Sequence, residues 1–530
     1  MEIAVLHHEG EEVAGAVVEA AMVRSFTAGQ VRRRTYDTMG ELPAGAVLVA
    51  PGDGERALVE RLSRGGRKVL VLGEPGREVA PLLGLRTGAL PGEAKAWHHV
   101  RLDGSEPFNA SPVSVRYDRS HGLGAAAVLE ERPLARYDFT DEWNNLGYGR
   151  MGPWPEEEGG GLWAVACLAD ADGARPLAAL TGGGRRLSLY AAVLDLPHAS
   201  LLWFNRAAGP VDSVEWRLVE TFFCDYRAGE LPTFPLLCEV PYGLDGLVTM
   251  RLDCDQAVSS ARCLFELYSD EGVPFSMAVT PGIGLDGEDM RLLRDVARSG
   301  GSLLTHSMSH RPDWGGCYEA AVDEVRRSVS WLEGHIEGAA PVRYAVSPFH
   351  RNPPFAVRAM ADAGIAAFVG GIIHNDPQYL LGRAGRVPAL PECAGPMVSL
   401  SQQCMLHGDC FHRYGDSVEP YIESFFNHLA AGSIFGYLDH PFSEAYSYGW
   451  RDEEERAGAH RALMDAVKGA GNIGFSSLGE CLDFLVMRDR VVLRSDGGRL
   501  VAEGATEQAG LELAVRRDGE VRRAVEVRRP

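Results

Sequence analysis

The fold is decided by the stretch Val248-Thr-Met-Arg-Leu-Asp253-Cys-Asp255, an apolar run that ends in two carboxylates. In an extended chain, residues two positions apart project to the same side, so Asp253 and Asp255 can face one site. Acidic pairs of this kind also occur in solvated loops and helix caps. The chemical meaning of this pair therefore depends on what the following segments bring to it.

From residue 246 onward, short apolar strands alternate with amphipathic helical segments. The strands we expect lie at 247–253, 274–279, 302–305, 342–347, 366–370, 397–401 and 433–438. The helices we expect lie at 257–271, 287–299, 318–335, 354–364 and 418–431. Seven or eight such units predict a (β/α) barrel over residues 246–485.

Reactive side chains follow several of these strands directly. One strand runs into Thr305-His306-Ser-Met-Ser-His310, one ends in Ser347-Pro-Phe-His-Arg351, and one ends in Asp439-His440. Two histidines four residues apart suit a shared metal ion, although an isolated pair is more often two loop histidines. In a barrel the carboxyl ends of the strands converge on one face, which predicts a single active site there.

At these positions the chain resembles the polysaccharide deacetylase family (NodB homology, carbohydrate esterase 4). The first family motif appears as Leu252-Asp-Cys-Asp255, and the second, H-[ST]-x-x-H, is matched in full by His306-Ser-Met-Ser-His310. The fifth, L-x-H, is Leu438-Asp-His440. The third is partial, because Ser347-Pro-Phe349 is present but Val346 replaces its arginine, and we identify no fourth motif. The resemblance implies a distorted (β/α) barrel with one divalent metal.

These residues predict a mechanism of amide hydrolysis. Asp255, His306 and His310 form a two-histidine, one-carboxylate set, which indicates a catalytic metal, most simply Zn²⁺ with Co²⁺, Ni²⁺ or Fe²⁺ as alternatives. Asp253 is the expected general base and His440 the expected general acid.

The third-motif segment is expected to contact the substrate. Pro348, Phe349, His350 and Arg351 are its candidate residues, with a backbone N–H near Phe349 facing the oxyanion. Without the third-motif arginine, either the base is less well held or another group, such as Arg251 or Arg351, takes its place.

A second cluster has ligand-type residues at tight spacing: Cys404, His407, Cys410 and His412. It fits either a structural zinc or, as we prefer, a barrel loop in which His407 or His412 lines the cleft. Several aromatic residues are candidates for stacking on sugar rings or for packing: Trp314, Tyr437, Tyr446 and Tyr448.

Residues 1–235 open with a strand–helix alternation that predicts a doubly wound parallel sheet. The region resembles class I glutamine-amidotransferase-like (ThuA-like) domains, through this opening, the segment Leu180-Thr-Gly-Gly-Gly-Arg-Arg-Leu187 and a closing helix at 213–226. It has no Gly-x-Cys-x-Gly elbow, so amidotransferase chemistry is not expected. Residues 486–530 predict a small β appendage.

The amino-acid composition limits the kinds of binding partner that we expect. The 530 residues contain 73 Asp and Glu against 52 Lys and Arg, a formal net charge of −21. This acidity argues against nucleic-acid and anionic-membrane partners. No signal peptide or membrane span is apparent, and the ten cysteines are scattered, so we expect a reduced cytoplasmic protein, compatible with a homo-oligomer.

The sequence thus predicts a metal-dependent hydrolase that removes an N-acetyl or similar acyl group from an amino sugar or glycoconjugate. Two alternatives stay open. One is a different amide hydrolase on the same barrel, allantoinase-like or deformylase-like. The other is a non-catalytic carbohydrate-binding or scaffold protein.

Overall fold

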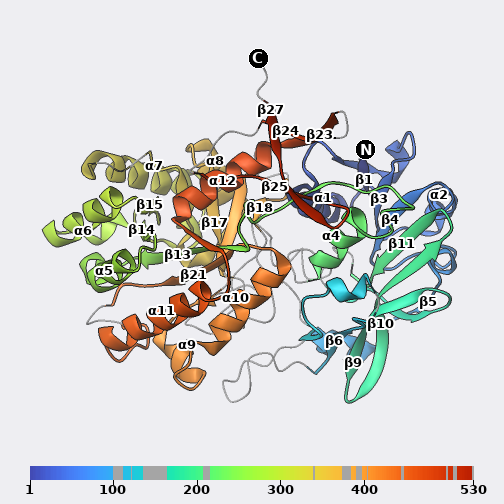
Figure 1. Cartoon of the computed structure of the whole chain (residues 1–530), viewed down its shortest axis with the longest axis horizontal. Helices are drawn as coiled ribbons and strands as arrows, with labels where there is room; N and C mark the ends of the chain where they lie inside the picture. The colour runs from blue at the N-terminus through green and yellow to red at the C-terminus, as the bar shows by residue number, and fades with distance from the viewer. Residues whose placement is uncertain are drawn as a thin grey trace.

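The computed structural model describes residues 1–98, 112–120, 122–134, 164–206, 215–337, 339, 341–372, 384–389, 397–402, 404–442, 447–496, 499–504 and 510–527. The chain forms a mixed α/β structure with an N-terminal sheet on one side and a curled, mostly parallel sheet on the other (Figure 1). Two small sheets from the C-terminal segment lie beside them. Among the described helices, none combines the length and apolar character needed to cross a bilayer.

The N-terminal sheet has the strand order β2-β1-β3-β4-β11-β10-β9-β6-β7. Its strands are β1 (Ile3–His7), β2 (Val31–Thr35), β3 (Gly45–Val49), β4 (Arg67–Leu72), β6 (Ser114–Tyr117), β7 (Glu131–Pro133), β9 (Arg175–Gly182), β10 (Arg185–Leu196) and β11 (Ala199–Phe204). The described helices of this region include α1 (Glu12–Phe26), α2 (Arg56–Leu62) and α4 (Trp216–Cys224). A separate antiparallel pair is formed by β5 (Leu85–Gly88) and β8 (Leu168–Ala171).

The prediction of an all-parallel N-terminal sheet is only half right. The strands from β2 to β11 pair in parallel, whereas β11, β10, β9, β6 and β7 pair antiparallel. The reason lies in Gly183 and Gly184, whose φ angles of +56° and +73° form a two-residue hairpin turn between β9 and β10. Such a turn demands positive φ at both positions and forces antiparallel pairing. The glycine run behind the amidotransferase resemblance is therefore a hairpin, and that resemblance is not confirmed.

The second sheet forms the predicted (β/α) region. Its order is β18-β19-β17-β16-β15-β14-β13-β21-β20, and β22 also pairs with β13. The strands are β13 (Gly246–Cys254), β14 (Ser276–Val279), β15 (Ser302–Thr305), β16 (Tyr344–Val346), β17 (Ala367–Ile372), β18 (Gly385–Arg386), β19 (Val398–Gln402), β20 (Cys404–Met405), β21 (Phe435–Asp439) and β22 (Ile473–Ser476). All pair in parallel except β18 with β19. In the described part of the chain, this path ends at β18 and β20, so the sheet is a curled, open barrel.

Helices follow these strands as the periodicity predicts. They are α5 (Arg262–Asp270), α6 (Gly287–Arg298), α7 (Tyr318–His335), α8 (Pro354–Asp362), α9 (Gly408–Arg413), α10 (Glu419–Ala431), α11 (Glu453–Lys468) and α12 (Leu478–Arg490). Strand β13 is buried along its whole length because Val248, Met250 and Leu252 pack with the apolar side chains of α5, α6 and α11. The alternate positions, Arg251 and Asp253, must then face the inside of the barrel.

Helix α12 closes the amino-terminal end of the barrel. The hydroxyl oxygen of Ser276 accepts the N–H of Leu478 (2.9 Å), and that of Ser302 accepts the N–H of Gly479 (3.0 Å). A Cβ on Gly479 would lie 2.6 Å from Ser302 Oγ, so only glycine permits this approach. With that end closed, the carboxyl ends of the strands remain for a site.

The N-terminal region and the barrel share one core. A single cluster of buried apolar side chains joins Phe26 and Phe223 to Met360 and Phe368. The C-terminal strands are β23 (Val492–Asp496), β24 (Arg499–Glu503), β25 (Ala514–Arg517), β26 (Glu520–Arg523) and β27 (Val525–Val527). Strand β25 pairs with β12 (Leu236–Leu237) of the connecting segment, so the tail is attached to the junction between the two regions.

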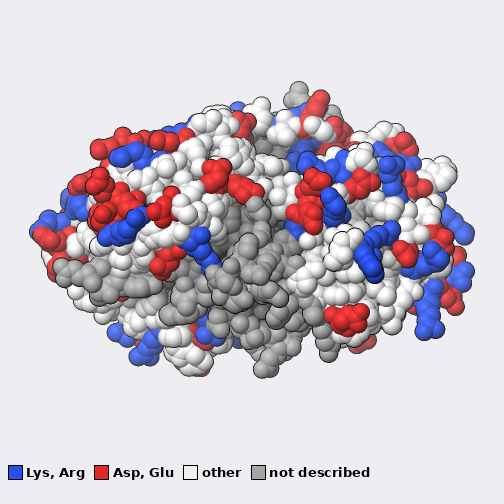
Figure 2. All heavy atoms as spheres, turned by 90° about the horizontal axis from the view of Figure 1, so that it is seen from below, with Lys and Arg blue, Asp and Glu red and all other residues white. Residues whose placement is uncertain are grey.

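The surface carries both signs of charge. Figure 2 shows lysine and arginine side chains interspersed with aspartate and glutamate on the face that it presents. Among the described residues of that face the two signs are intermixed, and no continuous basic stripe is seen.

Arg488 of α12 offers a test of this junction. It is buried and donates to the carbonyl oxygens of Cys238 (2.8 Å) and Leu237 (2.6 Å), and also to that of Arg24 in α1. We expect Arg488→Met to lower the free energy of unfolding by about 2–4 kcal/mol, because three buried carbonyl groups lose a charged donor. Urea denaturation measures this loss.

Arg494→Met is the matched control, because the Arg494 side chain is 60% exposed and pairs with Glu503 at the surface. Its effect should stay within about 0.5 kcal/mol. Equal stability of the two variants would contradict the role assigned to Arg488.

Candidate active site

Arg251 and Asp253 form a buried, two-pronged ion pair on β13. Arg251 Nε donates to Asp253 Oδ1 at 2.6 Å and Nη2 donates to Oδ2 at 2.9 Å. Burial alone would raise the pKa of Asp253, but the charge and hydrogen bonds of Arg251, together with the nearby histidines, outweigh it and hold that pKa well below its usual range. Of the two arginines expected to replace the missing one, Arg251 is therefore the one that pairs with Asp253. Arg351, the other candidate, instead pairs with Asp313 at 3.0 Å.

Asp255, His306 and His310 come together beside this pair. His306 Nε2 and His310 Nε2 are 3.1 Å apart, and Asp255 Oδ2 lies 3.9 Å from His310 Nε2. His306 Nδ1 lies 3.0 Å from the carbonyl oxygen of Val346, which can only accept, so Nδ1 carries the hydrogen and Nε2 carries the lone pair. Burial lowers the pKa of both histidines to about 4, so both are neutral near pH 7. Three such donors fit a divalent metal ion.

The loop that carries these histidines is held by Glu324 of α7. Its carboxylate accepts the backbone N–H of Ser309 (2.8 Å) and the hydroxyl of Ser309 (2.5 Å). Ser307 and His310 both have positive φ, 63° and 51°, and Ser307 Oγ accepts the N–H of His310 (2.9 Å). The role of Glu324 in holding this loop was not predicted from the sequence. Its signal was an acidic residue one position before Val325, within the buried stripe of α7.

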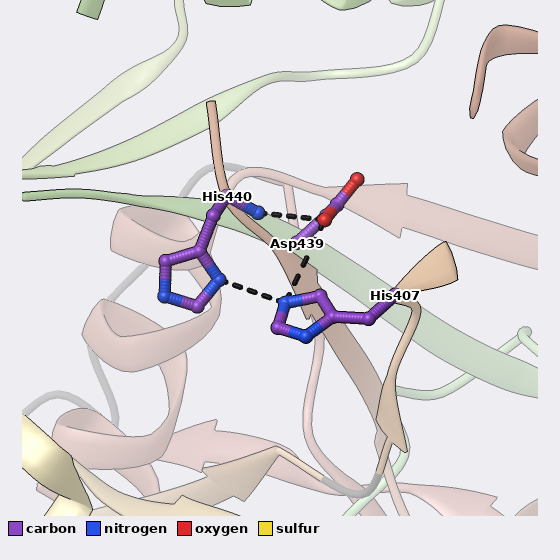
Figure 3. A group of neighbouring side chains, drawn as sticks. All are labelled: His407, Asp439 and His440. Atoms are coloured by element: carbon purple, nitrogen blue, oxygen red, sulfur yellow. Dashed lines mark hydrogen bonds and ion pairs between the residues drawn. The ribbon is translucent and has the colours of Figure 1, made fainter. Parts of the chain in front are cut away.

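His440 lies at the end of β21 and meets His407 (Figure 3). His440 Nδ1 is 2.8 Å from His407 Nε2, and Asp439 Oδ1 accepts the backbone N–H of His440 at 2.8 Å. The ring of Tyr448 stacks on the His440 ring at 4.2 Å and 14°. The Tyr448 hydroxyl donates to Asp255 Oδ1 (3.2 Å), so one tyrosine joins the expected metal ligands to the expected acid.

The Pro-Phe-His turn after β16 adjoins the same groups. Phe349 and His350 have φ angles of 53° and 54°, and the Phe349 ring lies 4.6 Å from the His310 ring. His350 is buried with Nε2 3.9 Å from Asp253 Oδ2, and burial holds its pKa well below the usual value. Its neighbour Pro348 is also buried. The turn therefore packs against the base and the ligands, while direct substrate contact by these residues stays a prediction.

Other candidates lie elsewhere. Trp314 is fully buried, so it offers no ring face for a sugar. The expectation that it lines the cleft is wrong, and the residue packs in the core. Tyr437 is also buried and bonds to the Tyr268 hydroxyl (2.7 Å). His412 pairs with Asp416 (2.6 Å) and turns away from His407. Tyr446 lies outside the described residues.

The structural-zinc alternative is not supported. Within the described ranges, two further groups have all their ligand atoms within 4.8 Å of one another, which makes them tighter than the open set of Asp255, His306 and His310. Neither group includes a cysteine: His407 with Asp439 and His440, and His412 with Asp416 and Glu455. Cys410 is buried, and burial raises the pKa of its thiol to about 12, which disfavours the thiolate that zinc needs.

Comparisons with known proteins give structural neighbours only. No protein-family model and no curated protein matches the chain. Among solved structures, the carbohydrate deacetylase Agd3 is 9% identical, covers 97% of this chain and 93% of its own, and gives a TM-score of 0.39. A candidate polysaccharide deacetylase from Mycobacterium smegmatis is 14% identical over 48% of this chain and 98% of its own, with a TM-score of 0.36. A cobalt-bound family 4 acetyl xylan esterase from Clostridium thermocellum is 13% identical over 45% and 91%, with a TM-score of 0.30.

The ion pair of Arg251 and Asp253 predicts a pH-dependent loss of stability. We expect Arg251→Met to lower the free energy of unfolding by about 3–5 kcal/mol at pH 7, because a buried carboxylate loses its counter-charge. In the wild type the folded pKa of Asp253 is depressed, so its stabilisation is present above the unfolded pKa of about 3.9 and is lost below it. In the variant burial raises that pKa, so stability is lost as pH rises. The gap between the two proteins should therefore narrow from pH 7 toward pH 4.

Urea denaturation of chelator-treated protein at the two pH values measures this gap. The double variant Arg251→Met/Asp253→Asn is the matched control, since it buries no charge at this position and should recover much of the stability. An equal difference in the free energy of unfolding at both pH values would contradict the role assigned to the ion pair.

Proposed function

We propose that this protein is a metal-dependent hydrolase that removes an N-acetyl or similar N-acyl group from an amino sugar or glycoconjugate. One observation carries the proposal: a carboxylate held ionised by Arg251 lies beside two neutral histidines and a second carboxylate at one end of the barrel. This arrangement suits attack by water on a carbonyl group. The motif resemblance in the sequence supplies the substrate class.

Asp255, His306 and His310 would hold one divalent ion, for which Zn²⁺ suits the nitrogen-rich donor set and Co²⁺, Ni²⁺ or Fe²⁺ are alternatives. When bound, such an ion polarises an acyl carbonyl and lowers the pKa of a neighbouring water. The hydrogen bond from His306 Nδ1 to Val346 fixes the ring so that Nε2 faces this position.

Asp253 takes the proton of the attacking water in this proposal. Arg251 keeps the carboxylate ionised and fixes both of its oxygens, so the base is ready before the substrate binds. A backbone N–H near Phe349 would face the developing oxyanion. His440 then gives a proton to the departing nitrogen as the C–N bond breaks, which releases the free amine and leaves the acyl group as a carboxylic acid.

Metal content and acetate release test the proposal together. We expect about one zinc-like ion per chain in the purified protein, and acetate release from at least one member of a panel of N-acetylated amino sugars. Treatment with a chelator should abolish the release, and added Zn²⁺ or Co²⁺ should restore it. A protein that stays inert with every metal and substrate would favour the non-catalytic binding alternative.

Substitution of Asp253 and of His306 should separate base from ligand. Asp253→Asn should lower kcat by about 10²–10⁴-fold while the metal stays bound, because only the proton acceptor is lost. His306→Ala should lose both metal and activity. Acetate release and metal analysis on the same samples give the readout.

Asp295→Asn is the matched control, since Asp295 pairs with Arg262 on the outer surface, and both readouts should match those of the wild type. Loss of metal in Asp253→Asn would mean that the roles of Asp253 and Asp255 are reversed.

A further inference from the structure

The expected acid, His440, has an unusual partner. A catalytic histidine is commonly oriented by a carboxylate on its second ring nitrogen. Here the residue at that distance is another imidazole, since His440 Nδ1 lies 2.8 Å from His407 Nε2 (Figure 3). The Tyr448 ring stacked on His440 restricts its rotation further.

His407 is itself firmly placed. It precedes helix α9 as the N-cap residue and is 1% exposed. The next residue, Gly408, touches the backbone of the loop that carries Tyr448: a Cβ there would lie 2.2 Å from the carbonyl carbon of Gly449. Both partners of His440 therefore come from two segments that lock against each other.

The carboxylate of the preceding residue, Asp439, already has other hydrogen-bond partners. Its Oδ2 accepts from His460 Nε2 at 3.0 Å, and its Oδ1 accepts the backbone N–H of His440. His460 Nδ1 in turn accepts from the Tyr268 hydroxyl at 2.8 Å, so the whole chain of groups is buried and oriented. The distance from Asp439 Oδ1 to His407 Nε2, 3.7 Å, exceeds that of a hydrogen bond.

We propose that His407 is the positioning residue for His440, with His407 Nε2 accepting the Nδ1–H of His440 in place of a carboxylate. The inference rests on the proposed function. When His440 is ready to act as an acid, both of its ring nitrogens carry hydrogen, so His407 must be the acceptor. His440 then delivers the Nε2 proton to the departing nitrogen and keeps the Nδ1 proton, which stays donated to His407.

The surroundings keep His407 neutral, as an acceptor must be. Burial, with repulsion from His440, lowers the pKa of His407 to about 3, and Asp439 opposes this only in part. The charged and titratable groups around His440 are these: His407 before α9, Asp439 on β21, Tyr448 from the following loop, Arg456 from α11, and His310 and His350 from the loops opposite.

His407→Leu and His407→Gln test the proposal. Leucine removes the acceptor, so kcat should fall about 10²-fold with little change in KM or metal content. It should also move the alkaline fall of kcat to lower pH, because the imidazolium of His440 loses a stabilising bond. Glutamine keeps an acceptor oxygen near the Nε2 position and should recover most of the rate and the pH profile. His335→Leu, at an exposed histidine that ends helix α7, is the matched control and should leave kcat unchanged.

Nitrogen-15 spectra of the histidine rings give a readout that needs no turnover. In the wild type we expect neutral His440, assigned by comparison with His440→Gln, to carry its proton on Nδ1, and in His407→Leu to shift toward Nε2. Wild-type kcat and pH profile in His407→Leu, or a neutral His440 protonated on Nε2 in the wild type, would overturn the proposal. Two ions per wild-type chain, with one lost in His407→Leu, would instead assign His407, Asp439 and His440 to a second metal. If no substrate is cleaved, the proposed function fails and the ring spectra still decide the pairing.

Discussion

The buried ion pair between Arg251 and Asp253 is the interaction on which the rest of the site depends. A lone carboxylate inside a barrel would take up a proton, because burial disfavours its charge. Because side chains alternate along β13, Arg251 lies on the same face as Asp253 and supplies the counter-charge. Leu252, which packs on the outer helices, separates the two residues that face inward, so acid and counter-charge come from one strand.

Closure of the opposite end of the barrel is the second constraint. Helix α12 seals the amino-terminal end through Ser276 and Ser302, and the same helix ties the barrel to the N-terminal region through Arg488. The apolar cluster that contains Phe223 and Met360 continues across this junction. The N-terminal region is thus part of the structural support of the barrel, and the loops at the carboxyl end are the part of the fold that is left to carry chemistry.

Much of the barrel and of its site follows from local patterns in the sequence. Alternating strands and helices predicted the parallel order, and reactive residues at strand ends predicted which groups would meet, as the contacts of His306 with His310 illustrate. The missing features depend on contacts between distant segments. No local sequence pattern predicts the pairing of β25 with β12 or the contact of His407 with His440. The N-terminal sheet was predicted as parallel throughout, and the antiparallel half was missed because the glycine run at Gly183 was taken as support for the amidotransferase resemblance and its hairpin was not recognised.

The site contains two close pairs of histidines, and their different surroundings suit one pair to binding a metal and the other to holding a proton. The ring nitrogens of His306 and His310 are 3.1 Å apart, and those of His407 and His440 are 2.8 Å apart. A backbone carbonyl fixes the hydrogen of His306 on the far nitrogen, so its lone pair faces His310 and Asp255, as a ligand requires. At His440 the neighbouring carboxylate is already bonded to His460. The second pair can therefore hold a proton between its rings, which is the requirement for an acid rather than for a metal ligand.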